Sequence, residues 1–568
     1  MPNPQTSPPE ESEQPRPRSV PAVTLGELAA SVGAGLHGAA GAARIRITGF
    51  THDSRQVRPG DLYAAMPGAT VHGAEFAAAV AAAGAAAVLT DPAGAEIIRA
   101  ASAAAVGSET PGSETPGAET PGSAGAETTG SADAVTAGPL GSLPVLVVPE
   151  VRPALGPAAS LIYGDPSRRL LMLGVTGTNG KTTTCYLMEG GLRAAGRSTG
   201  LIGTVETRIG TRSIKSTRTT PEAPDLQALL AVMTESGVDA LAMEVSSHAL
   251  AYGRTAGIRY AVAAFTNLTQ DHLDFHADLE DYFAAKAKLF TPDYAGIAVV
   301  NTDDPYGRRI AVQAHAVGVP VWSYSAAGDE AADWRAEDLE LGPDGSAFVL
   351  AGPDGQHYPA AVRLPGAFNV ANAMAAILTL IAAGLDPERV VAGVAGVPGV
   401  PGRMQKVEAG QDFLAVVDYA HTPDAVSTLL AAVRPVTRGR LAVVVGCGGD
   451  RDRAKRPLMG AAAAWGADAV YLTDDNPRSE KSLDILGAAE AGARQALAEG
   501  AKAEVTVIPD RAAAIGAAIA AAGPGDSVLV AGKGHERGQE VDGVVHPFDD
   551  VEVVRGALAR AAGGAAGS

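Results

Sequence analysis

From about Leu170 onward, short apolar runs alternate with segments in which hydrophobic residues recur at helical spacing. The runs are rich in Val, Leu and Ala and lie at 170–175, 442–447, 469–474 and 527–532. This alternation is typical of βαβ units and predicts parallel sheets in an α/β fold. Each run leads into a polar loop, and ligands of open α/β sheets bind at the carboxyl ends of the strands. We therefore expect the functional residues in these loops.

Two stretches lack this pattern. Residues 1–20 are rich in Pro, Ser, Glu and Gln, which predicts a disordered tail. Residues 107–121 read GSETP, GSETP and GAETP, and the low complexity continues to about Gly141. Such a composition cannot bury enough apolar surface to fold, so we expect a flexible insertion. It separates two apolar runs, 85–91 and 143–148, that we expect to be buried strands.

The chain has 568 residues, of which 46% are hydrophobic, and a formal net charge of -19. This length favours two to four domains, and the hydrophobic content favours globular cores. The negative charge argues against broad binding of nucleic acid or of anionic membranes, because both need a basic surface. Phosphate ligands remain possible, since backbone N–H groups and a few local cations can hold them.

Two cysteines, Cys185 and Cys447, are too few for a disulfide framework and fit a reducing compartment. The N-terminus is polar, with no apolar segment typical of a secretory signal. No apolar run reaches the roughly 18 residues that a membrane helix needs. These features predict a cytoplasmic protein without membrane insertion.

The clearest motif is GVTGTNGKTTT at 174–184, which follows an apolar run and opens a helical stretch. This is the context of a phosphate-binding loop. Glycines let the backbone approach phosphates, Lys181 supplies a point charge, and the Thr182 hydroxyl can bind Mg²⁺. The strict spacing is missed, because Val175 stands where a glycine is expected. The alternative is a plain glycine-rich turn, which the GKT ending disfavours.

TGTNGKTT resembles the Mur ligase family, which includes folylpolyglutamate synthetases. The resemblance extends from Asp53 to Glu536 and looks like the MurE-type branch, the UDP-N-acetylmuramoyl-tripeptide synthetases. It implies three α/β domains after the tail: a UDP-binding domain at 21–166 with the insertion at about 107–141, a central P-loop-like ATPase domain at 167–396, and a C-terminal Rossmann-like domain at 397–568.

Three further stretches carry possible metal ligands: EVSSHAL at 244–250, NLTQDH at 267–272 and AAKAKLF at 284–290. Alone, each is more often structural. The resemblance implies a Mg²⁺ site formed by Thr182, Glu244, His272 and a carbamylated Lys286, with Lys181 also catalytic. Lys286 and Lys288 are two apart on an expected helix, so only one can face the site. A carbamate is an anionic oxygen ligand, whereas an ammonium would repel Mg²⁺.

The resemblance also implies the nucleotide contacts. For ATP these are Gly177, Thr178, Asn179, Gly180, Lys181, Thr182, Thr183, Asn372 and Arg403. For the UDP-linked substrate they are Ser54, Thr219, Thr220, Ser246 and Arg254. Two neighbours depart from the family pattern: Arg218 stands where Asn is common, and Tyr252 where Gln is common. These departures leave the detailed substrate contacts open.

Three loops after apolar runs, 446–451, 475–478 and 532–536, can converge on one ligand. Arg478 can clasp a carboxylate through two parallel N–H bonds, and Glu536 can accept from an ammonium. By resemblance, DNPR at 475–478 marks diaminopimelate-adding members, since lysine has no distal carboxylate. The alternative is a turn with a surface arginine. The residues implied to bind diaminopimelate are Arg451, Asp475, Asn476, Pro477, Arg478, Gly532 and Glu536.

The predicted function is an ATP-dependent, ADP-forming amide ligase of peptidoglycan synthesis. It would add diaminopimelate, by default the meso form, to UDP-N-acetylmuramoyl-L-alanyl-D-glutamate through an acyl phosphate. ATP is a substrate, Mg²⁺ the cofactor, and the partners are small molecules bound by a monomer. A lysine-adding or folylpolyglutamate-type ligase is one alternative. A non-catalytic nucleotide-binding switch is another, but it would be expected to have lost Lys181, Glu244 or Lys286.

Overall fold

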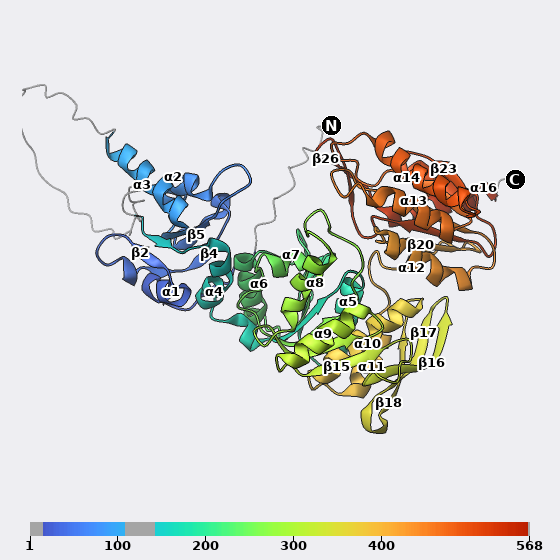
Figure 1. Cartoon of the computed structure of the whole chain (residues 1–568), viewed down its shortest axis with the longest axis horizontal. Coiled ribbons are helices and arrows are strands. Elements are labelled where there is room, and N and C mark those ends of the chain that lie inside the picture. The colour runs from blue at the N-terminus through green and yellow to red at the C-terminus, as the bar shows by residue number, and fades with distance from the viewer. Residues whose placement is uncertain (1–14, 108–142, 566–568) are drawn as a thin grey trace, which may run out of the picture. The chain divides into compact units, whose positions relative to one another are not determined.

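The structure is a computed structural model that describes residues 15–107 and 143–565 (Figure 1). The expected insertion and most of the expected tail lie outside the described residues. By internal contacts the chain forms two units. The first comprises the chain up to Arg169 together with Pro221–Glu235 and Tyr252–Ile258, and the second comprises the remainder. Each unit is described separately below.

The first unit is built on a five-stranded sheet with the order β2-β7-β6-β5-β4. The strands are β2 (Gly35–His37), β4 (Gly49–Thr51), β5 (Asp61–Ala65), β6 (Ala87–Thr90) and β7 (Val145–Val147), parallel except for β2. The expected strands on either side of the insertion are thus confirmed as the neighbours β6 and β7. A short ribbon, β1 (Val23–Thr24) with β3 (Arg46–Ile47), completes the strands described in this unit.

Helices α1 (Leu25–Val32), α2 (Ala77–Ala82), α3 (Pro92–Gly107), α4 (Val151–Ile162) and α6 (Ala223–Glu235) complete the first unit. Helix α6 shares a core with α4, through side chains such as Ala228 and Leu155. It therefore packs with this unit although it lies within the range expected for the central domain. The residue bounds expected for the three domains remain predictions.

The last residues of the expected tail make defined contacts. Arg16 donates hydrogen bonds to the Asp61 carboxylate and to the Gln56 carbonyl, and the backbone N–H groups of Arg18 and Ser19 bind Glu235. Residues 15–20, the end of the expected tail, therefore take a defined place in the structure. Composition predicted disorder because the segment has little apolar surface to bury. It is held instead by polar contacts to the buried carboxylate of Asp61 and the exposed carboxylate of Glu235.

The second unit contains an eleven-stranded sheet with the order β11-β10-β9-β12-β8-β13-β14-β15-β16-β17-β18. The strands from β9 to β16 are parallel, and antiparallel hairpins form both edges. Their bounds are β8 (Leu171–Thr176), β9 (Thr199–Ile202), β10 (Glu206–Ile209), β11 (Arg212–Lys215), β12 (Ala240–Glu244), β13 (Tyr260–Phe265), β14 (Ala295–Asn301), β15 (Val321–Ser325), β16 (Trp334–Gly342), β17 (Gly345–Ala351) and β18 (His357–Val362).

The helices of this region are α5 (Lys181–Ala194), α7 (Ser247–Ala251), α8 (Leu279–Ala287), α9 (Pro305–Ala316), α10 (Ala367–Ala382) and α11 (Pro387–Ala395). Helices α5 and α10 are buried on most of their faces and share one core with the central strands. Because β12, β8 and β13 are adjacent and parallel, the loops that follow them meet at one edge of the sheet.

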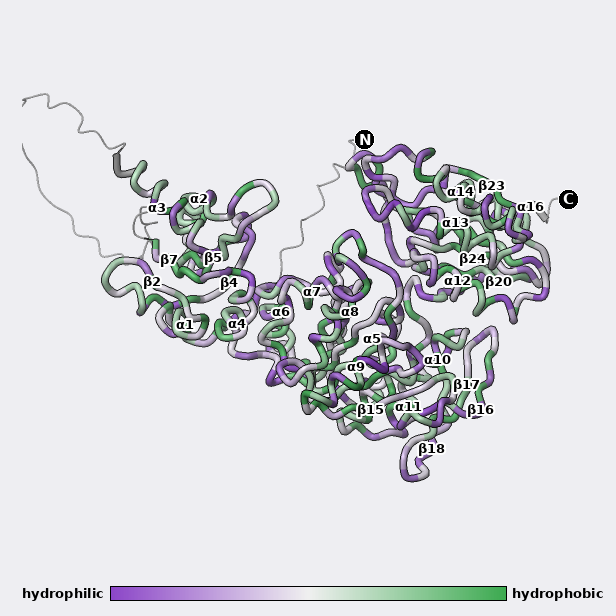
Figure 2. The backbone as a smooth tube through the Cα atoms, viewed as in Figure 1, coloured by the Kyte–Doolittle hydropathy of each residue, from purple (hydrophilic) through white to green (hydrophobic). Residues whose placement is uncertain are grey.

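The C-terminal part of the second unit has its own sheet, with the order β19-β20-β24-β21-β22-β23. The strands are β19 (Gln405–Lys406), β20 (Leu414–Asp418), β21 (Leu441–Val445), β22 (Ala469–Leu472), β23 (Glu504–Val507) and β24 (Ser527–Ala531), parallel from β20 to β23. Every residue of β24 is buried, and Figure 2 shows this strand as a hydrophobic segment. The doubly wound pattern predicted from the sequence is confirmed.

Helices α12 (Pro423–Val433), α13 (Lys455–Gly466), α14 (Ser482–Ala498), α15 (Arg511–Ala520) and α16 (Asp550–Ala565) cover this sheet, and a hairpin of β25 (Gly538–Val541) and β26 (Val544–Pro547) follows β24. The predicted α/β fold class is thus confirmed in the three larger sheets. In the described ranges, no helix combines the length and the apolar character that a bilayer crossing requires.

A fully buried ion pair fastens the last helix to this sheet. The Arg511 guanidinium donates from Nε and Nη2 to the two Asp550 carboxylate oxygens, at 2.8 and 2.7 Å, and neither side chain is exposed. Nη2 also donates to the carbonyl of Ala531, at the end of β24. The pair therefore joins the starts of α15 and α16 to a strand end that precedes a predicted ligand loop.

Arg511→Met is expected to lower the free energy of unfolding by about 3–5 kcal/mol, because it leaves Asp550 charged and unpaired in the interior. The measurement is the first urea-unfolding transition followed by circular dichroism. Arg494→Ala is the matched control, since its pair with Glu490 is at the surface and should contribute at most about 0.5 kcal/mol. Equal losses in the two variants would contradict the assignment of Arg511 as a buried anchor.

Candidate active site

The phosphate loop lies between β8 and α5, as the sequence predicted, and two of its glycines are required by close approaches. Gly177 and Gly180 have φ of +154° and +87°. A Cβ at Gly177 would lie 1.9 Å from the Thr266 hydroxyl oxygen, and one at Gly180 would lie 2.2 Å from Asn372 Oδ1. Only glycine fits both the backbone conformation and the space. Asn372, expected to contact ATP, therefore packs directly on the phosphate loop.

Lys181 folds back over the loop and donates from Nζ to the carbonyls of Gly177 and Thr178, at 2.9 and 2.8 Å. Burial lowers the pKa of Lys181, against an opposing effect of Glu244. The loop is also tied to the segment after β13, since the Asn267 side-chain oxygen accepts from the backbone N–H of Asn179. A loop held by these hydrogen bonds, with a cation at its centre, suits the binding of phosphate groups.

The end of β12 supplies a buried carboxylate beside this loop. Glu244 is fully buried, and its two carboxylate oxygens accept from the backbone N–H and the hydroxyl of Thr204, at 2.8 and 3.0 Å. The Thr204 hydroxyl contacts that of Thr219 at 3.0 Å, and the Thr220 hydroxyl donates to the Glu244 carbonyl. Thr219 and Thr220, which were predicted to bind the UDP-linked substrate, are thus part of the same network.

Lys286 lies on α8 and Lys288 directly after it, and the two differ in burial, as the spacing predicted. Lys286 is buried and Lys288 is exposed. Lys286 Nζ donates to the Gly177 carbonyl at 2.8 Å and lies 4.4 Å from the centre of the Tyr282 ring. Burial and repulsion from Lys181 hold the pKa of Lys286 well below its usual range. A neutral amine is the form that reacts with carbon dioxide to give a carbamate.

His272 lies at the cavity wall in a left-handed backbone conformation, with φ of +56°. Burial lowers the pKa of its ring to about 4, although Asp271 acts in the opposite direction. The ring is therefore neutral near pH 7 and can act as a metal ligand.

The donor set can accommodate Mg²⁺. Glu244, Thr182 and His272 supply one carboxylate, one hydroxyl and one neutral imidazole, and a carbamylated Lys286 would add a second anion. Within the described ranges, no three His, Cys, Asp or Glu side chains cluster as a metal site. Such a sparse set fits Mg²⁺, which usually keeps several water ligands and also binds substrate phosphates.

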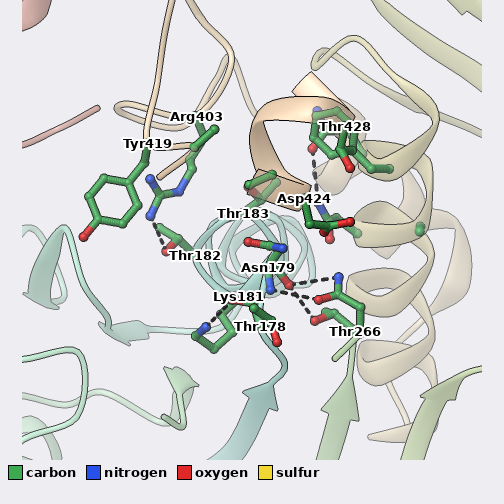
Figure 3. Close-up of a pocket in the computed structure, with 18 of the residues that line it drawn as sticks. Thr178, Asn179, Lys181, Thr182, Thr183, Thr266, Arg403, Tyr419, Asp424 and Thr428 are labelled. Atoms are coloured by element: carbon green, nitrogen blue, oxygen red, sulfur yellow. Dashed lines mark hydrogen bonds between the residues drawn. The ribbon is translucent and has the colours of Figure 1, made fainter. Parts of the chain in front are cut away.

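These residues surround one cavity of about 500 Å³. Figure 3 shows Lys181 and Thr182 beside Asn179, with Arg403 and Tyr419 at one side. Arg403 Nη2 donates to the Thr182 hydroxyl at 3.1 Å, and its guanidinium lies 4.3 Å from the centre of the Tyr419 ring. The predicted residues that line the cavity are Thr178, Asn179, Gly180, Lys181, Thr182, Thr183, Thr219, Glu244, Ser246, His272, Lys286, Asn372 and Arg403.

Sequence reasoning missed several residues of the cavity wall. Asn301 ends β14, Asp303 follows it, and Asp424 and Thr428 lie on α12. The strand-end rule could have drawn attention to the loop after β14, because NTDD at 301–304 follows an apolar run. The residues on α12 carried no comparable signal, since they face the cavity only through tertiary packing.

Two of the predicted substrate contacts belong to the first unit. Ser54 opens a short 3₁₀ helix, Ser54–Gln56, whose preceding residue Asp53 caps it by accepting from the Arg55 N–H. Arg254 forms an ion pair with Glu222 at 2.9 Å. Tyr252, which departs from the family pattern, lies under the guanidinium groups of Arg152 and Arg254.

The three predicted amino-acid loops converge at the ends of the adjacent strands β24, β21 and β22. Asn476 Nδ2 donates to the Glu536 carboxylate at 3.1 Å. Arg478 Nη1 donates to the Gly449 carbonyl at 2.7 Å, and its Nε donates to Glu540 at 3.2 Å. Arg451, in contrast, is exposed and does not join this network in the described structure.

Lys533 is a central residue of this network that the sequence analysis did not single out. Its side chain is fully buried, and Nζ donates to Asn476 Oδ1 at 2.9 Å and to the Glu536 carboxylate at 3.2 Å. Lys533 therefore fixes two of the residues predicted to bind the amino acid. A signal was present, because Lys533 lies within the loop 532–536 that was already identified.

The fold and the phosphate loop define a nucleotide-binding protein with three larger α/β sheets and a ligand cavity in the second unit, lined by the phosphate loop and by residues of α12. Family models match the Mur ligase middle domain at residues 175–380, the Mur ligase glutamate ligase domain at 402–534 and the catalytic domain of the Mur ligase family at 46–124. The chain belongs to the Mur ligase family.

Relatives with high identity carry one name, UDP-N-acetylmuramoyl-L-alanyl-D-glutamate--2,6-diaminopimelate ligase. The Streptomyces avermitilis protein is 54% identical over 549 residues, which cover 97% of this chain and 99% of that protein. The Corynebacterium glutamicum protein is 47% identical and covers 88% and 89%. A solved structure of the same name is 31% identical, with a TM-score of 0.61, and covers 95% and 99%.

More distant structures share the fold alone. A MurF structure from Acinetobacter baumannii is 18% identical, with a TM-score of 0.59, and covers 95% of this chain and all of that one. A folylpolyglutamate synthase from Mycobacterium tuberculosis is 20% identical, with a TM-score of 0.53, and covers 72% and 94%. The likeness to the folylpolyglutamate enzyme therefore extends over less of this chain.

Proposed function

We propose that this protein is an ATP-dependent ligase that joins 2,6-diaminopimelate to UDP-N-acetylmuramoyl-L-alanyl-D-glutamate. The observation that carries the proposal is the loop DNPR at the end of β22. In this loop Asn476 binds Glu536 and Lys533. Arg478 binds Glu540 and the Gly449 carbonyl, where it can serve a substrate carboxylate. The relatives named for this reaction, identical at 54% and 47%, support it.

The reaction would run in two steps. The terminal carboxylate of the UDP-linked dipeptide attacks the γ-phosphorus of ATP, which releases ADP and gives an acyl phosphate. The diaminopimelate amine then attacks the acyl carbon, forms the amide, loses a proton and expels phosphate. Lys181 and the backbone N–H groups of the loop 177–183 stabilise the charge of the transferring phosphoryl group. Arg403, held on Thr182, adds a second cation at the same cavity.

Thr182, Glu244, His272 and carbamylated Lys286 would hold Mg²⁺, which neutralises phosphate charge when it is bound. Ser54, Thr219, Thr220, Ser246 and Arg254 are proposed to bind the UDP-linked dipeptide. Asp475, Asn476, Pro477, Arg478, Gly532 and Glu536 are proposed to bind diaminopimelate, with Arg451 joining them on ligand binding. We further propose that the enzyme acts as a cytoplasmic monomer.

The proposal is tested by phosphate release from ATP with the UDP-linked dipeptide, Mg²⁺ and one amino acid at a time. Release is expected with diaminopimelate, and roughly 10²-fold less with lysine, which would leave Arg478 without its carboxylate. Equal release with lysine would contradict the assigned amino acid. Release without any dipeptide would contradict the ligase assignment.

A further inference from the structure

Residues 15–20, here called the N-terminal strap, hold the loop that carries Ser54. We propose that Arg16 is a positioning residue that fixes this loop for binding of the UDP-linked substrate. The inference rests on the proposed function, which assigns Ser54 to that substrate. It gives a role to a segment that composition alone marks as a disordered tail.

The loop is held at both ends. At its start, the Asp53 carboxylate accepts from the Arg55 N–H at 3.0 Å and caps the turn Ser54–Gln56. At its end, the Gln56 carbonyl accepts from Arg16 Nη2 at 3.0 Å. The first restraint is local, whereas the second comes from a residue 40 positions earlier. Arg16 therefore acts only two residues away from Ser54.

The same guanidinium is anchored on a buried carboxylate. Asp61, the first residue of β5, is 1% exposed, and its two oxygens accept from Arg16 Nη1 at 2.7 and 2.6 Å. Asp61 also accepts from the Arg58 N–H at 2.9 Å, which closes the other side of the loop. A buried carboxylate is costly unless it is paired, so Asp61 favours keeping Arg16 in place.

The sheet leaves room for this pair. A Cβ on Gly49 of β4 would lie 2.2 Å from Asp61 Oδ1 and 3.0 Å from Arg16 Nη1. The strap is anchored a second time where the backbone N–H groups of Arg18 and Ser19 each donate to the Glu235 carboxylate at 3.0 Å. Glu235 ends α6, so the strap runs from the sheet to that helix within the first unit.

The geometry requires arginine. The planar guanidinium reaches the Asp61 carboxylate with one nitrogen and the Gln56 carbonyl with another, while a lysine ammonium is a single point charge. Loss of Arg16 would release the end of the loop, and Ser54 would then no longer be held in one position. The expected kinetic effect is confined to the UDP-linked substrate, because the ATP cavity lies in the other unit.

The test uses the full chain and steady-state kinetics of the proposed reaction, with melting temperature measured in parallel. Arg16→Ala is expected to raise KM for the UDP-linked dipeptide roughly tenfold, with KM for ATP and kcat nearly unchanged. Arg16→Lys should give an intermediate KM. Arg18→Ala is the matched control, since Arg18 binds Glu235 through its backbone N–H, and all its parameters should stay at the wild-type values.

A double variant separates positioning from stability. In Arg16→Ala/Asp61→Asn the unpaired buried carboxylate is gone, so the melting temperature should recover. KM for the dipeptide should stay high, because the Gln56 carbonyl still lacks its hydrogen bond from Arg16. If Arg16→Ala does not fold, this variant and Arg16→Lys carry the test. An unchanged KM, or a KM that recovers together with the melting temperature, would overturn the inference. If the wild-type chain does not turn over the dipeptide, the proposed function itself is wrong, and the inference falls with it.

Discussion

Lys286→Ala is expected to reduce turnover by at least about 10²–10³-fold, the loss typical of removing a preorganised electrostatic group from an active site. The buried amine at the Gly177 carbonyl would react with carbon dioxide, forming an N–C bond and releasing a proton. The resulting carbamate is the anion that we propose as a Mg²⁺ ligand. Alanine removes that ligand and leaves a space beside the phosphate loop.

Short carboxylates such as formate or acetate should partly restore the activity of Lys286→Ala by occupying this space. The carbamate can also be detected directly, by carbon-13 NMR of the wild-type protein in labelled bicarbonate. Lys288→Ala is the matched control on the same segment, because Lys288 is exposed and should be dispensable. Full activity of Lys286→Ala would remove the residue from the site. Failure of the rescue, with no labelled signal, would contradict the carbamate alone.

Arg478→Ala is expected to lower kcat/KM for diaminopimelate by up to two to three orders of magnitude. Truncating one partner of a buried charge pair costs roughly 2–5 kcal/mol, and here the unpaired partner would be the distal carboxylate of the substrate. The structure shows how Arg478 can serve as this clasp. Of its five N–H donors, one is used on Gly449 and one on Glu540, which leaves three for a ligand.

The measurement compares diaminopimelate with lysine in the wild type and the variant. Lysine has no distal carboxylate, so its already low kcat/KM should not fall together with that of diaminopimelate. The preference for diaminopimelate over lysine should therefore shrink in the variant. KM for ATP should change little. Arg478→Lys keeps the charge without the planar fork and should recover only part of the loss. If both amino acids lose rate equally, Arg478 is a structural residue.

The sequence predicted those parts of the site that obey local rules. Glycines before a GKT sequence, and polar loops after apolar runs, locate ligand loops because parallel strands end at a common edge. The phosphate loop and the loop of Arg478 were located in this way, whereas the role of Glu244 was implied only by the resemblance to the Mur ligase family. Helical spacing predicted that only one of Lys286 and Lys288 faces the site, and the resemblance selected Lys286.

The parts that were missed depend on contacts between distant segments. Arg16 meets Asp61 and Gln56 only after the chain has folded, and its surroundings in the sequence are those of a disordered tail. Lys533 is a lone lysine in a glycine-rich loop, and its burial cannot be read from neighbours. Long-range polar pairing leaves no periodic trace in the sequence, whereas apolar packing does.

The path of α6 limits how this chain can be divided. The backbone passes between the two units five times, after residues 169, 220, 235, 251 and 258. A fragment ending at Arg169 would lack α6 and would expose the apolar surface of α4 that Ala228 and its neighbours cover. Such a fragment would be prone to self-association and would not reproduce the structure of the first unit. Work on the first unit alone would therefore need a redesigned chain in which α6 is joined directly behind α4.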